Sequence, residues 1–380
     1  MDFELSEDHV LIQQAAREFS REVLAPRAAE LDRTGTFPIE NFKEAAARGF
    51  AGFLIPEDLG GSGLGNMAMA LAMIEINKGC ASTGVTLSVH NSLVCGPLRK
   101  FGNDAQRKRW LPRLASGELL GAYSLSEASC GSDAAAVRCS AVRDGGHWVI
   151  NGTKMWVTSG SHADLFVVFV RTNSRVSNAK GITALVVEKG TPGFRIGKKE
   201  DKLGIRASST TELVFEDCRV PAENLLGEQD GGFKIGMHTL DGGRIGIASQ
   251  AIGIASACLD ASVKYSKERI QFGRPIADFQ AIQFKIAEMA TKIDAATLLV
   301  LRAAWLKDLD RPHSTEAAMA KLEASRAANY CAREAVQIHG GAGYMVDFPV
   351  ERHFRDARIT EIYEGTTEIQ KIVIARSQLK

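Results

Sequence analysis

The hydrophobic periodicity of this chain changes twice, and those changes limit the folds that it can adopt. Up to about residue 120, apolar residues recur at helical spacing between Gly and Pro breaks. From about 121 to 230, short β-branched and aromatic runs alternate with turn residues, as in strands. From about 231 to 380 the helical pattern returns. The order predicts an α+β fold with an N-terminal helical domain (1–120), a middle antiparallel β-barrel or sandwich domain (121–230) and a C-terminal helical domain (231–380).

Local signals place individual helices in the two helical blocks. Ser6 precedes the acidic Glu7 and Asp8, so we expect it to cap a first helix. Four apolar residues then share one face of that helix before Pro26: Ile12, Ala16, Phe19 and Val23. A second stripe, at spacings of four and three, predicts a long helix that faces a core rather than a ligand: Ile282, Ile286, Met289, Ile293, Ala296 and Val300.

The middle block contains one strong turn signal. Asn151-Gly152 tolerates positive φ at both positions, so we expect it to join strands His147–Ile150 and Thr153–Val157 in a hairpin. Further runs with the composition of strands are Leu165–Val170, Ile182–Glu188 and Thr211–Phe215.

Composition narrows the classes of function. The formal net charge is only +1, which argues against a nucleic-acid-binding protein. The seven cysteines form no CxxC pair, which favours free thiols in a reducing compartment. The acidic start is unlike a secretory signal, and no run looks long and apolar enough to span a bilayer. We expect a soluble protein, cytoplasmic in a bacterium or, if processed, in the mitochondrial matrix.

Several common chemistries lack their motifs. The sequence has no GxGxxG after a strand and no Walker A segment, so Rossmann and P-loop nucleotide sites are unsupported. It also has no HExxH, no Cys/His cluster at zinc spacing and no GxSxG. We therefore expect no metal site.

Three polar, glycine-containing segments remain as candidate sites. The loop 123–133 is rich in hydroxyls and could hold a polar ring or a phosphate, or could simply join two domains. Trp156 and Thr158 could cover and hydrogen-bond a flat cofactor, or could be ordinary core residues. Glu364 lies between Tyr363 and Gly365, where partial burial would make it a stronger base, although it could equally cap a helix.

Together these segments resemble the acyl-CoA dehydrogenase family, and the likeness covers essentially the whole chain. The most specific match is R-D-x-R-x-x-x-I-Y-E-G-T at 355–366. The run Q-x-x-G-G-x-G-Y matches at 337–344, and R-I-Q-F-G matches at 269–273 with Gln280 beyond it. The central loop matches at 125–127 and 131–133. The resemblance implies a C-terminal four-helix bundle, a homotetramer, FAD bound across a subunit interface, an acyl-CoA substrate and an electron-transfer flavoprotein as partner.

The resemblance also implies roles for individual residues. Glu364 would remove the substrate α-proton while the β-hydride passes to flavin N5. The residues implied to bind FAD are Tyr123, Leu125, Ser126, Gly131, Ser132, Trp156, Val157, Thr158, Arg269, Phe272, Gln280, Gln337, Ile338, Gly340, Gly341, Thr366 and Glu368. The residues implied to contact acyl-CoA are Ser132, Asp241, Gly242, Gly243, Arg244, Tyr363 and Gly365.

Two positions bear on these assignments. Some family members carry the base on an earlier helix, at the position that is Gly243 here, and a glycine cannot act as a base. The family usually has Pro after the Ser-Glu of the central loop, whereas this chain has Ala128, followed by Ser129-Cys130, so the rigidity of this loop could differ.

Substrate class is less constrained. Residues 81–85 and 88–93 resemble the acyl-pocket helix of short-chain, butyryl-CoA-type members, and residues 80–98 contain no arginine for a distal carboxylate. His90 could meet the acyl group or serve only in packing. Short linear, branched and cyclic acyl groups stay open. The alternatives to a dehydrogenase are an acyl-CoA oxidase, which oxygen consumption would identify, and a silent assembly factor, which would be colourless.

Overall fold

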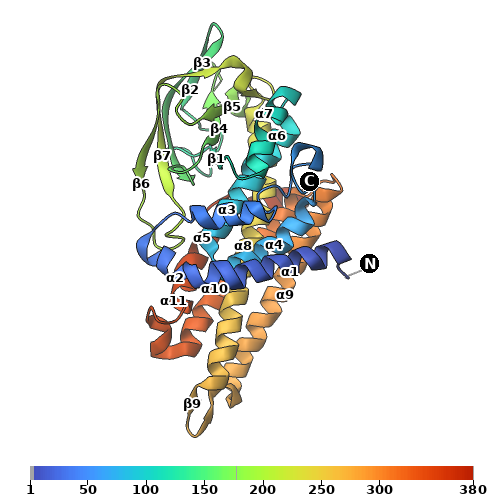
Figure 1. Cartoon of the computed structure of the whole chain (residues 1–380), viewed down its shortest axis with the longest axis vertical. Coiled ribbons are helices and arrows are strands. Elements are labelled where there is room, and N and C mark those ends of the chain that lie inside the picture. The colour runs from blue at the N-terminus through green and yellow to red at the C-terminus, as the bar shows by residue number, and fades with distance from the viewer. Residues whose placement is uncertain (1–3, 177, 380) are drawn as a thin grey trace.

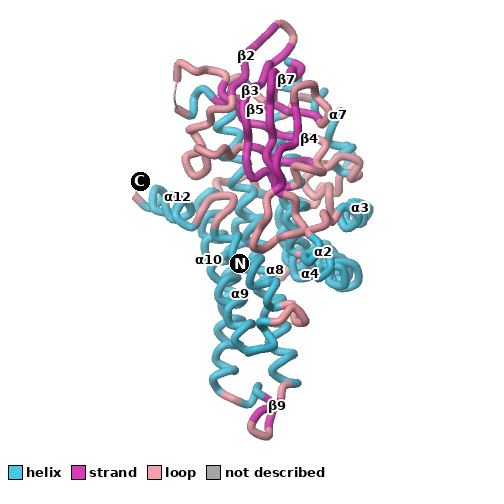
Figure 2. The backbone as a smooth tube through the Cα atoms, turned by 90° about the vertical axis from the view of Figure 1, so that its left-hand side faces the viewer, coloured by secondary structure: helices cyan, strands magenta, loops and turns pink. Residues whose placement is uncertain are grey.

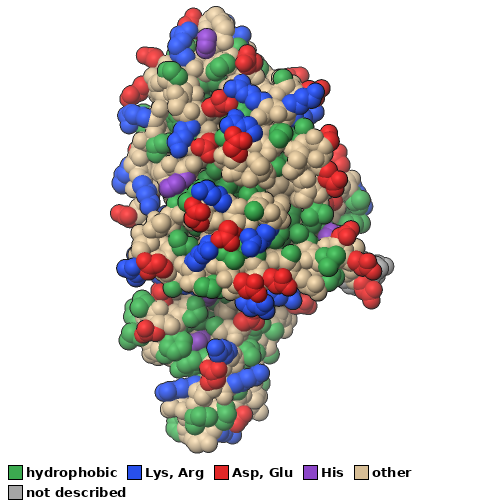
Figure 3. All heavy atoms as spheres, viewed as in Figure 1, with side chains coloured by type: hydrophobic (Ala, Val, Ile, Leu, Met, Phe, Trp, Pro, Cys, Tyr) green, Lys and Arg blue, Asp and Glu red, His purple; other side chains and the backbone are tan. Residues whose placement is uncertain are grey.

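The computed structural model describes residues 4–176 and 178–379 of the 380-residue chain. The molecule is elongated: the sheet lies at one end, and long C-terminal helices extend to the other (Figure 1). Turned by 90°, the sheet stands above the ends of these helices, with N-terminal helices to one side (Figure 2). On the face in Figure 3, acidic and basic side chains are interspersed, in keeping with the small net charge. The predicted helix–sheet–helix fold class is confirmed.

The N-terminal helices form a layer beside the junction between sheet and bundle. Ser6 caps the first of them as predicted, because its hydroxyl accepts a hydrogen bond from the His9 N–H at 3.3 Å. Pro26 does not end the helical run, because it occupies the first turn of the next helix, where a missing N–H is tolerated. The helices are α1 (Glu7–Phe19), α2 (Ala25–Thr34), α3 (Ile39–Ala47), α4 (Gly65–Gly79), α5 (Ala81–Ser88), α6 (Gly96–Phe101) and α7 (Asp104–Ala115).

The middle strands form one sheet in the order β6-β7-β3-β2-β4-β5-β8, with β1 beside β4. Pairing is mostly antiparallel as expected, but β1 and β2 each run parallel to β4. The predicted run Ile182–Glu188 coincides with a strand, and two others lie within longer ones. The strands are β1 (Gly121–Ser124), β2 (Ser140–Asp144), β3 (His147–Thr158), β4 (Leu165–Arg171), β5 (Ile182–Glu188), β6 (Phe194–Lys199), β7 (Thr210–Pro221) and β8 (Leu225–Leu226).

The predicted hairpin at Asn151-Gly152 is wrong. Strand β3 continues without a turn through these residues, and the turn that joins β2 to β3 lies instead at Gly145-Gly146. Asn151 and Gly152 lie at a bulge in the pairing with β7, where the Asn151 amide donates to Asp217 Oδ1 at 3.0 Å and its oxygen accepts the Asp217 N–H at 2.8 Å. Both dipeptides suit turns, and only the pairing with β7 decided between them.

The C-terminal helices form a bundle in which α8, α9 and α10 pack along one another and α12 packs on α10. The predicted stripe lies on α9: Met289, Ala296 and Val300 are buried, and the three isoleucines pack partly buried against the same core. The elements are α8 (Gly232–Glu268), β9 (Ile270–Gln271), β10 (Arg274–Pro275), α9 (Gln280–Asp308), α10 (Ser314–His339), α11 (Val350–Arg358) and α12 (Thr367–Gln378).

Helix α8 corrects one sequence expectation. Among the described residues it alone is long and apolar enough to cross a membrane, although no such run was expected. Most of its apolar stretch is buried inside the protein, where it packs against α4, α9 and α10. Its apolar character is therefore that of a core helix.

Candidate active site

A cavity of about 760 Å³ lies where the sheet, the N-terminal helices and the C-terminal bundle meet. It brings together residues from all three blocks that are far apart in sequence. The predicted site residues that line it are Tyr123, Leu125, Ser126, Gly131, Ser132, Trp156, Thr158, Arg244, Tyr363, Glu364, Gly365 and Thr366.

Glu364 projects a carboxylate into this cavity from a strained turn. Its φ is +50°, in the left-handed region that few residues other than glycine adopt, and Gly365 follows with φ +96°. Oε2 is buried and has no hydrogen-bond partner among the described residues. Burial raises the pKa of the carboxyl from 4.5 to about 7, against the opposing effects of Lys321 and Arg244. Glu364 therefore has the free lone pairs and the pKa of a general base at neutral pH.

The turn that carries Glu364 is held on both sides. The Tyr363 hydroxyl donates to Gln250 Oε1 on α8. The Gly365 carbonyl accepts from Lys321 Nζ of α10 at 2.7 Å and from Gln370 Nε2 of α12 at 2.8 Å. Three helices thus fix an otherwise unfavourable backbone conformation, which is how strain persists at functional sites.

Gly243 lies directly against the Glu364 carboxylate. A Cβ at this position of α8 would overlap Glu364 Oε2 and approach Leu93. The position that carries the base in some family members is therefore next to the carboxylate of Glu364. Glycine leaves the space that Glu364 occupies.

Trp156 reaches the cavity through an irregularity in the sheet. The pairing of β3 with β7 shifts register between Lys154 and Val157, and Trp156 in this bulge has φ +57°. Its side chain is 53% exposed, whereas Val157 is 1% exposed and points into the hydrophobic core. Thr158 lines the cavity again. The bulge thus presents an aromatic face and a hydroxyl to the same space.

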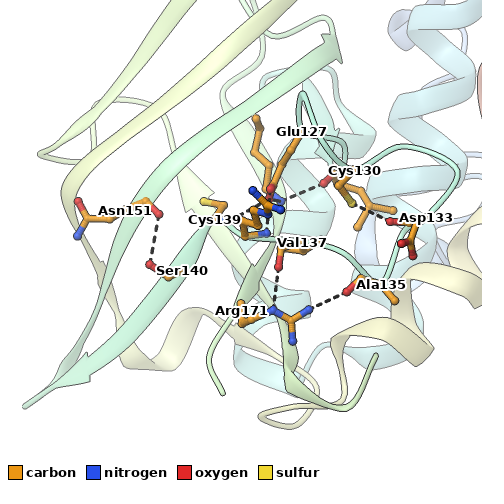
Figure 4. Close-up of polar contacts among 12 residues, drawn as sticks. Glu127, Cys130, Asp133, Ala135, Val137, Cys139, Ser140, Asn151 and Arg171 are labelled. Atoms are coloured by element: carbon orange, nitrogen blue, oxygen red, sulfur yellow. Dashed lines mark hydrogen bonds and ion pairs between the residues drawn. The ribbon is translucent and has the colours of Figure 1, made fainter. Parts of the chain in front are cut away.

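The central loop is held by buried polar contacts rather than by proline. Glu127 and Cys130 exchange backbone hydrogen bonds of 2.8 and 3.1 Å around Ala128-Ser129. The Glu127 carboxylate accepts from Lys154 Nζ at 2.8 Å and from two backbone N–H groups, those of Arg138 and Cys139 (Figure 4). A buried, hydrogen-bonded ion pair of this kind restrains the loop. The loop is therefore fixed despite the Ala128 departure.

Strand β4 adds a second restraint on the chain that follows this loop. Arg171 donates to the carbonyls of Ala135 at 2.7 Å and Val137 at 2.8 Å (Figure 4). The Cys130 thiol in turn bonds the Asp133 carbonyl at 3.1 Å. These contacts fix the path of the segment that presents Gly131 and Ser132 to the cavity.

Arg244 supplies positive charge to the wall formed by α8. It is buried, and it donates to Asp241 Oδ1 at 2.7 Å, which also accepts from the Ser314 hydroxyl at 3.0 Å. Its Nε is buried without a partner among the described residues. Burial lowers the pKa of Arg244, while Asp241 and Glu364 oppose that effect.

Another part of the cavity wall is apolar. Val85, Val89 and Leu93 line it at intervals of four residues, from α5 and the π-helical stretch Val89–Cys95, and they face Met237 and Leu240 of α8. His90 does not line it. Its ring nitrogens bond the Leu114 carbonyl at 3.1 Å and the Gly121 N–H at 3.2 Å, so His90 ties the N-terminal block to β1.

The remaining predicted site residues lie outside the cavity. Asp241, Gly242 and Gly243 are on α8 beside it, and Glu368 is exposed in the first turn of α12. Six others lie at the far end of the bundle, at the β9–β10 hairpin and the end of α10 (Figure 1). The end of α10 packs against α8 there, since the His339 ring stacks on Tyr265 with centroids 4.2 Å apart. This second group comprises Arg269, Phe272, Gln337, Ile338, Gly340 and Gly341, with Gln280 at the start of α9.

Some residues that shape the site carried no recognisable signal in the sequence. Lys154, Lys321 and Gln250 act through contacts that span tens of residues or more. A buried lysine inside an element looks like any surface lysine until its neighbours are known. The pattern of valines at 85 and 89 did carry a signal, through the resemblance of that helix to an acyl pocket.

Comparison with known proteins agrees with this geometry. Family profiles for acyl-CoA dehydrogenase match in order: the N-terminal domain at residues 6–118, the middle domain at 122–218 and the C-terminal domain at 230–379. The mitochondrial short-chain specific acyl-CoA dehydrogenase of Rattus norvegicus is 52% identical over 377 residues, covering 99% of this chain and 91% of the relative.

Two solved structures are similar along the whole chain. Butyryl-CoA dehydrogenase from Megasphaera elsdenii superposes with a TM-score of 0.98 at 44% identity, covering 100% of both chains. A chain solved in work on the electron-transferring flavoprotein of Acidaminococcus fermentans has a TM-score of 0.99 at 48% identity and the same coverage. The family profiles match nearly the whole chain, and the short-chain relative is 52% identical to it. The chain therefore belongs to the acyl-CoA dehydrogenase family.

Proposed function

We propose that this enzyme removes the α-proton and the β-hydride of a short-chain acyl-CoA to give the 2-enoyl-CoA, with Glu364 as the base. One observation carries the proposal: Glu364 Oε2 is buried without a hydrogen-bond partner among the described residues, in a cavity with an apolar wall, and the pKa of this half-buried carboxyl is raised to about 7. A carboxyl with that pKa is about half ionised at pH 7, so it can accept a proton without being permanently protonated.

The polar part of the cavity fits FAD. Ser126, Ser132 and Thr158 present hydroxyls beside the half-exposed Trp156 ring, and Tyr123 Oη is buried without a partner in the described part of the chain. These residues would hold the isoalloxazine and ribityl part. When bound, FAD would accept the hydride that leaves the substrate β-carbon. The chain's own contribution is to orient the substrate and to hold the base.

The α-proton of a thioester is only weakly acidic, so removing it requires stabilisation of the developing negative charge. We propose that the backbone N–H of Glu364 donates to the thioester oxygen, which delocalises that charge. Arg244 adds a positive charge to the wall of the same cavity. Excluding water from this site strengthens both interactions.

The substrate class follows from the apolar wall and from the relatives. Val85, Val89 and Leu93 leave room for an acyl group but offer no cation for a distal carboxylate. Several relatives of about 50% identity are short-chain specific acyl-CoA dehydrogenases, and one solved neighbour is a butyryl-CoA dehydrogenase. We therefore assign short acyl groups, with electron-transfer flavoprotein as the acceptor.

Assembly would complete the cofactor site. Phe272 is 93% exposed at the tip of the β9–β10 hairpin, far from the cavity of its own chain. We propose that, in a homotetramer, Arg269, Phe272 and Gln280 bind the adenine side of FAD together with residues 337–341 of a neighbouring subunit. Thr366 and Glu368 would also line this FAD site. The tetramer would work in a bacterial cytoplasm or, in a processed form, in the mitochondrial matrix.

Glu364→Gln tests the proposal. The variant should keep its yellow flavin and lose turnover of butyryl-CoA by about 10²–10⁴-fold, because a positioned base contributes that much. Glu323→Gln, an exposed change on α10, is the matched control and should leave turnover intact. Anaerobic flavin bleaching across acyl-CoAs from propionyl to octanoyl, with isobutyryl and cyclohexanecarbonyl, ranks the substrates. The proposed function would be refuted by any of three results: activity retained in Glu364→Gln, a purified protein that is colourless, or oxygen consumption in place of dye reduction.

A further inference from the structure

A second buried titratable residue lies beside the base and has no part in the mechanism above. The Lys321 side chain on α10 is 0% exposed. Lysine is rarely buried completely, because removing an ammonium from water is costly unless the charge is compensated. A fully buried lysine next to a reactive carboxylate therefore calls for a functional explanation.

Its hydrogen bond points to the turn that carries Glu364. Lys321 Nζ donates to the Gly365 carbonyl at 2.7 Å rather than to a carboxylate. The same carbonyl accepts from the neutral amide of Gln370 at 2.8 Å. The carbonyl therefore has a charged and an uncharged donor, and either contact could hold the turn by geometry alone.

The charge of Lys321 is what separates the two donors. Of the two cations that act on Glu364, Lys321 has the larger effect, and Arg244 is already paired with Asp241. The other groups that face the base are the phenols of Tyr123 and Tyr363, whose pKa burial raises, so they stay neutral. The lysine thus offers the main uncommitted positive charge near the base.

The groups around Lys321 leave it charged at neutral pH. Burial, with a smaller contribution from Arg244, lowers the pKa of its ammonium from 10.5 to about 8. Glu364, Glu361 and Glu368 oppose this effect. The residue carries its proton at pH 7, where the base must be ionised.

We propose that Lys321 is a positioning residue for proton abstraction: it fixes the Gly365 carbonyl, and its charge favours the ionised form of Glu364 that can take the α-proton. The inference rests on the proposed function. Lys321 itself neither gains nor loses a proton in the reaction. The proton leaves the substrate α-carbon and forms an O–H bond on Glu364, and Lys321 acts on this step only through the turn and through its charge.

The test is the pH profile of kcat/KM for butyryl-CoA, measured on the flavin-loaded enzyme. Lys321→Gln keeps a donor for the Gly365 carbonyl but removes the charge, and Lys321→Met removes both. In both variants the acid limb should move to higher pH by about 1 unit, the lower end of the effect of a nearby opposite charge. Lys321→Arg should restore much of the wild-type profile. Gln370→Leu removes the uncharged donor and should leave the limb in place, even if kcat falls.

The outcomes separate this inference from the proposed function. If Glu364→Gln is inactive but the limb of Lys321→Gln is unchanged, the role of Lys321 is refuted while the base assignment stands. An equal shift in Gln370→Leu would refute it too, because geometry alone would then explain the effect. Loss of bound flavin in both uncharged variants would show that Lys321 serves the fold instead. Activity in Glu364→Gln would remove the proposed function itself.

Discussion

Glu364→Gln should change the pH dependence of stability as well as lower turnover. The carboxyl has a pKa of about 7 in the folded protein against 4.5 ordinarily, because it is buried. Below pH 4.5 the carboxyl is mostly neutral in both the folded and the unfolded state, so it hardly changes the free energy of unfolding. As the pH rises from 4.5 to 7, the unfolded chain ionises this carboxyl while the buried group in the folded protein still holds its proton, so stability is lost. Above about pH 7 the carboxyl is ionised in both states and the loss levels off. At about 1.4 kcal/mol per pH unit, the loss reaches about 3 kcal/mol by pH 8.

Glutamine at position 364 carries no charge, so the variant escapes this loss. The free energy of unfolding of Glu364→Gln minus that of the wild type should grow by about 3 kcal/mol between pH 4.5 and 8. Urea titrations of both flavin-loaded proteins at several pH values measure this difference. Glu30→Gln is the control, because Glu30 is exposed and Arg33 lowers its pKa. A difference that stays constant with pH would refute the claim that burial makes Glu364 a base.

Three further changes test other parts of the site. Gly243→Val should displace the Glu364 carboxylate and lower kcat by about 10²-fold or more with flavin retained, as measured by steady-state kinetics. Glu127→Gln should leave Lys154 as an uncompensated buried charge, costing about 3–5 kcal/mol in denaturant titrations and weakening flavin retention; an unchanged midpoint would contradict this. His90→Leu should cost about 1–3 kcal/mol, because it leaves two buried backbone groups unpaired, while the ranking of acyl-CoAs should not change.

Local sequence patterns predicted the elements well but not all of their connections. The apolar stripe on α9 and the strand Ile182–Glu188 were predictable because helices and strands bury one face at a characteristic period. The Asn151-Gly152 turn failed because the same dipeptide also suits a bulge, and the choice depends on a partner strand some 60 residues away. Turn chemistry is local, whereas strand pairing is not.

The sequence by itself determined the three-block architecture and the family, and it singled out Glu364 as the proposed base, because these depend on periodicity and on motifs read along the chain. Only the tertiary structure decided why Glu364 can act as a base. Its carboxylate is buried against Gly243, which lies 121 positions earlier, and its turn is fixed by Lys321 and Gln250 from two other helices. Burial, strain and the charge around a carboxyl arise from residues that the fold brings together, so the sequence could propose Glu364, whereas only the packing raises its pKa to about 7.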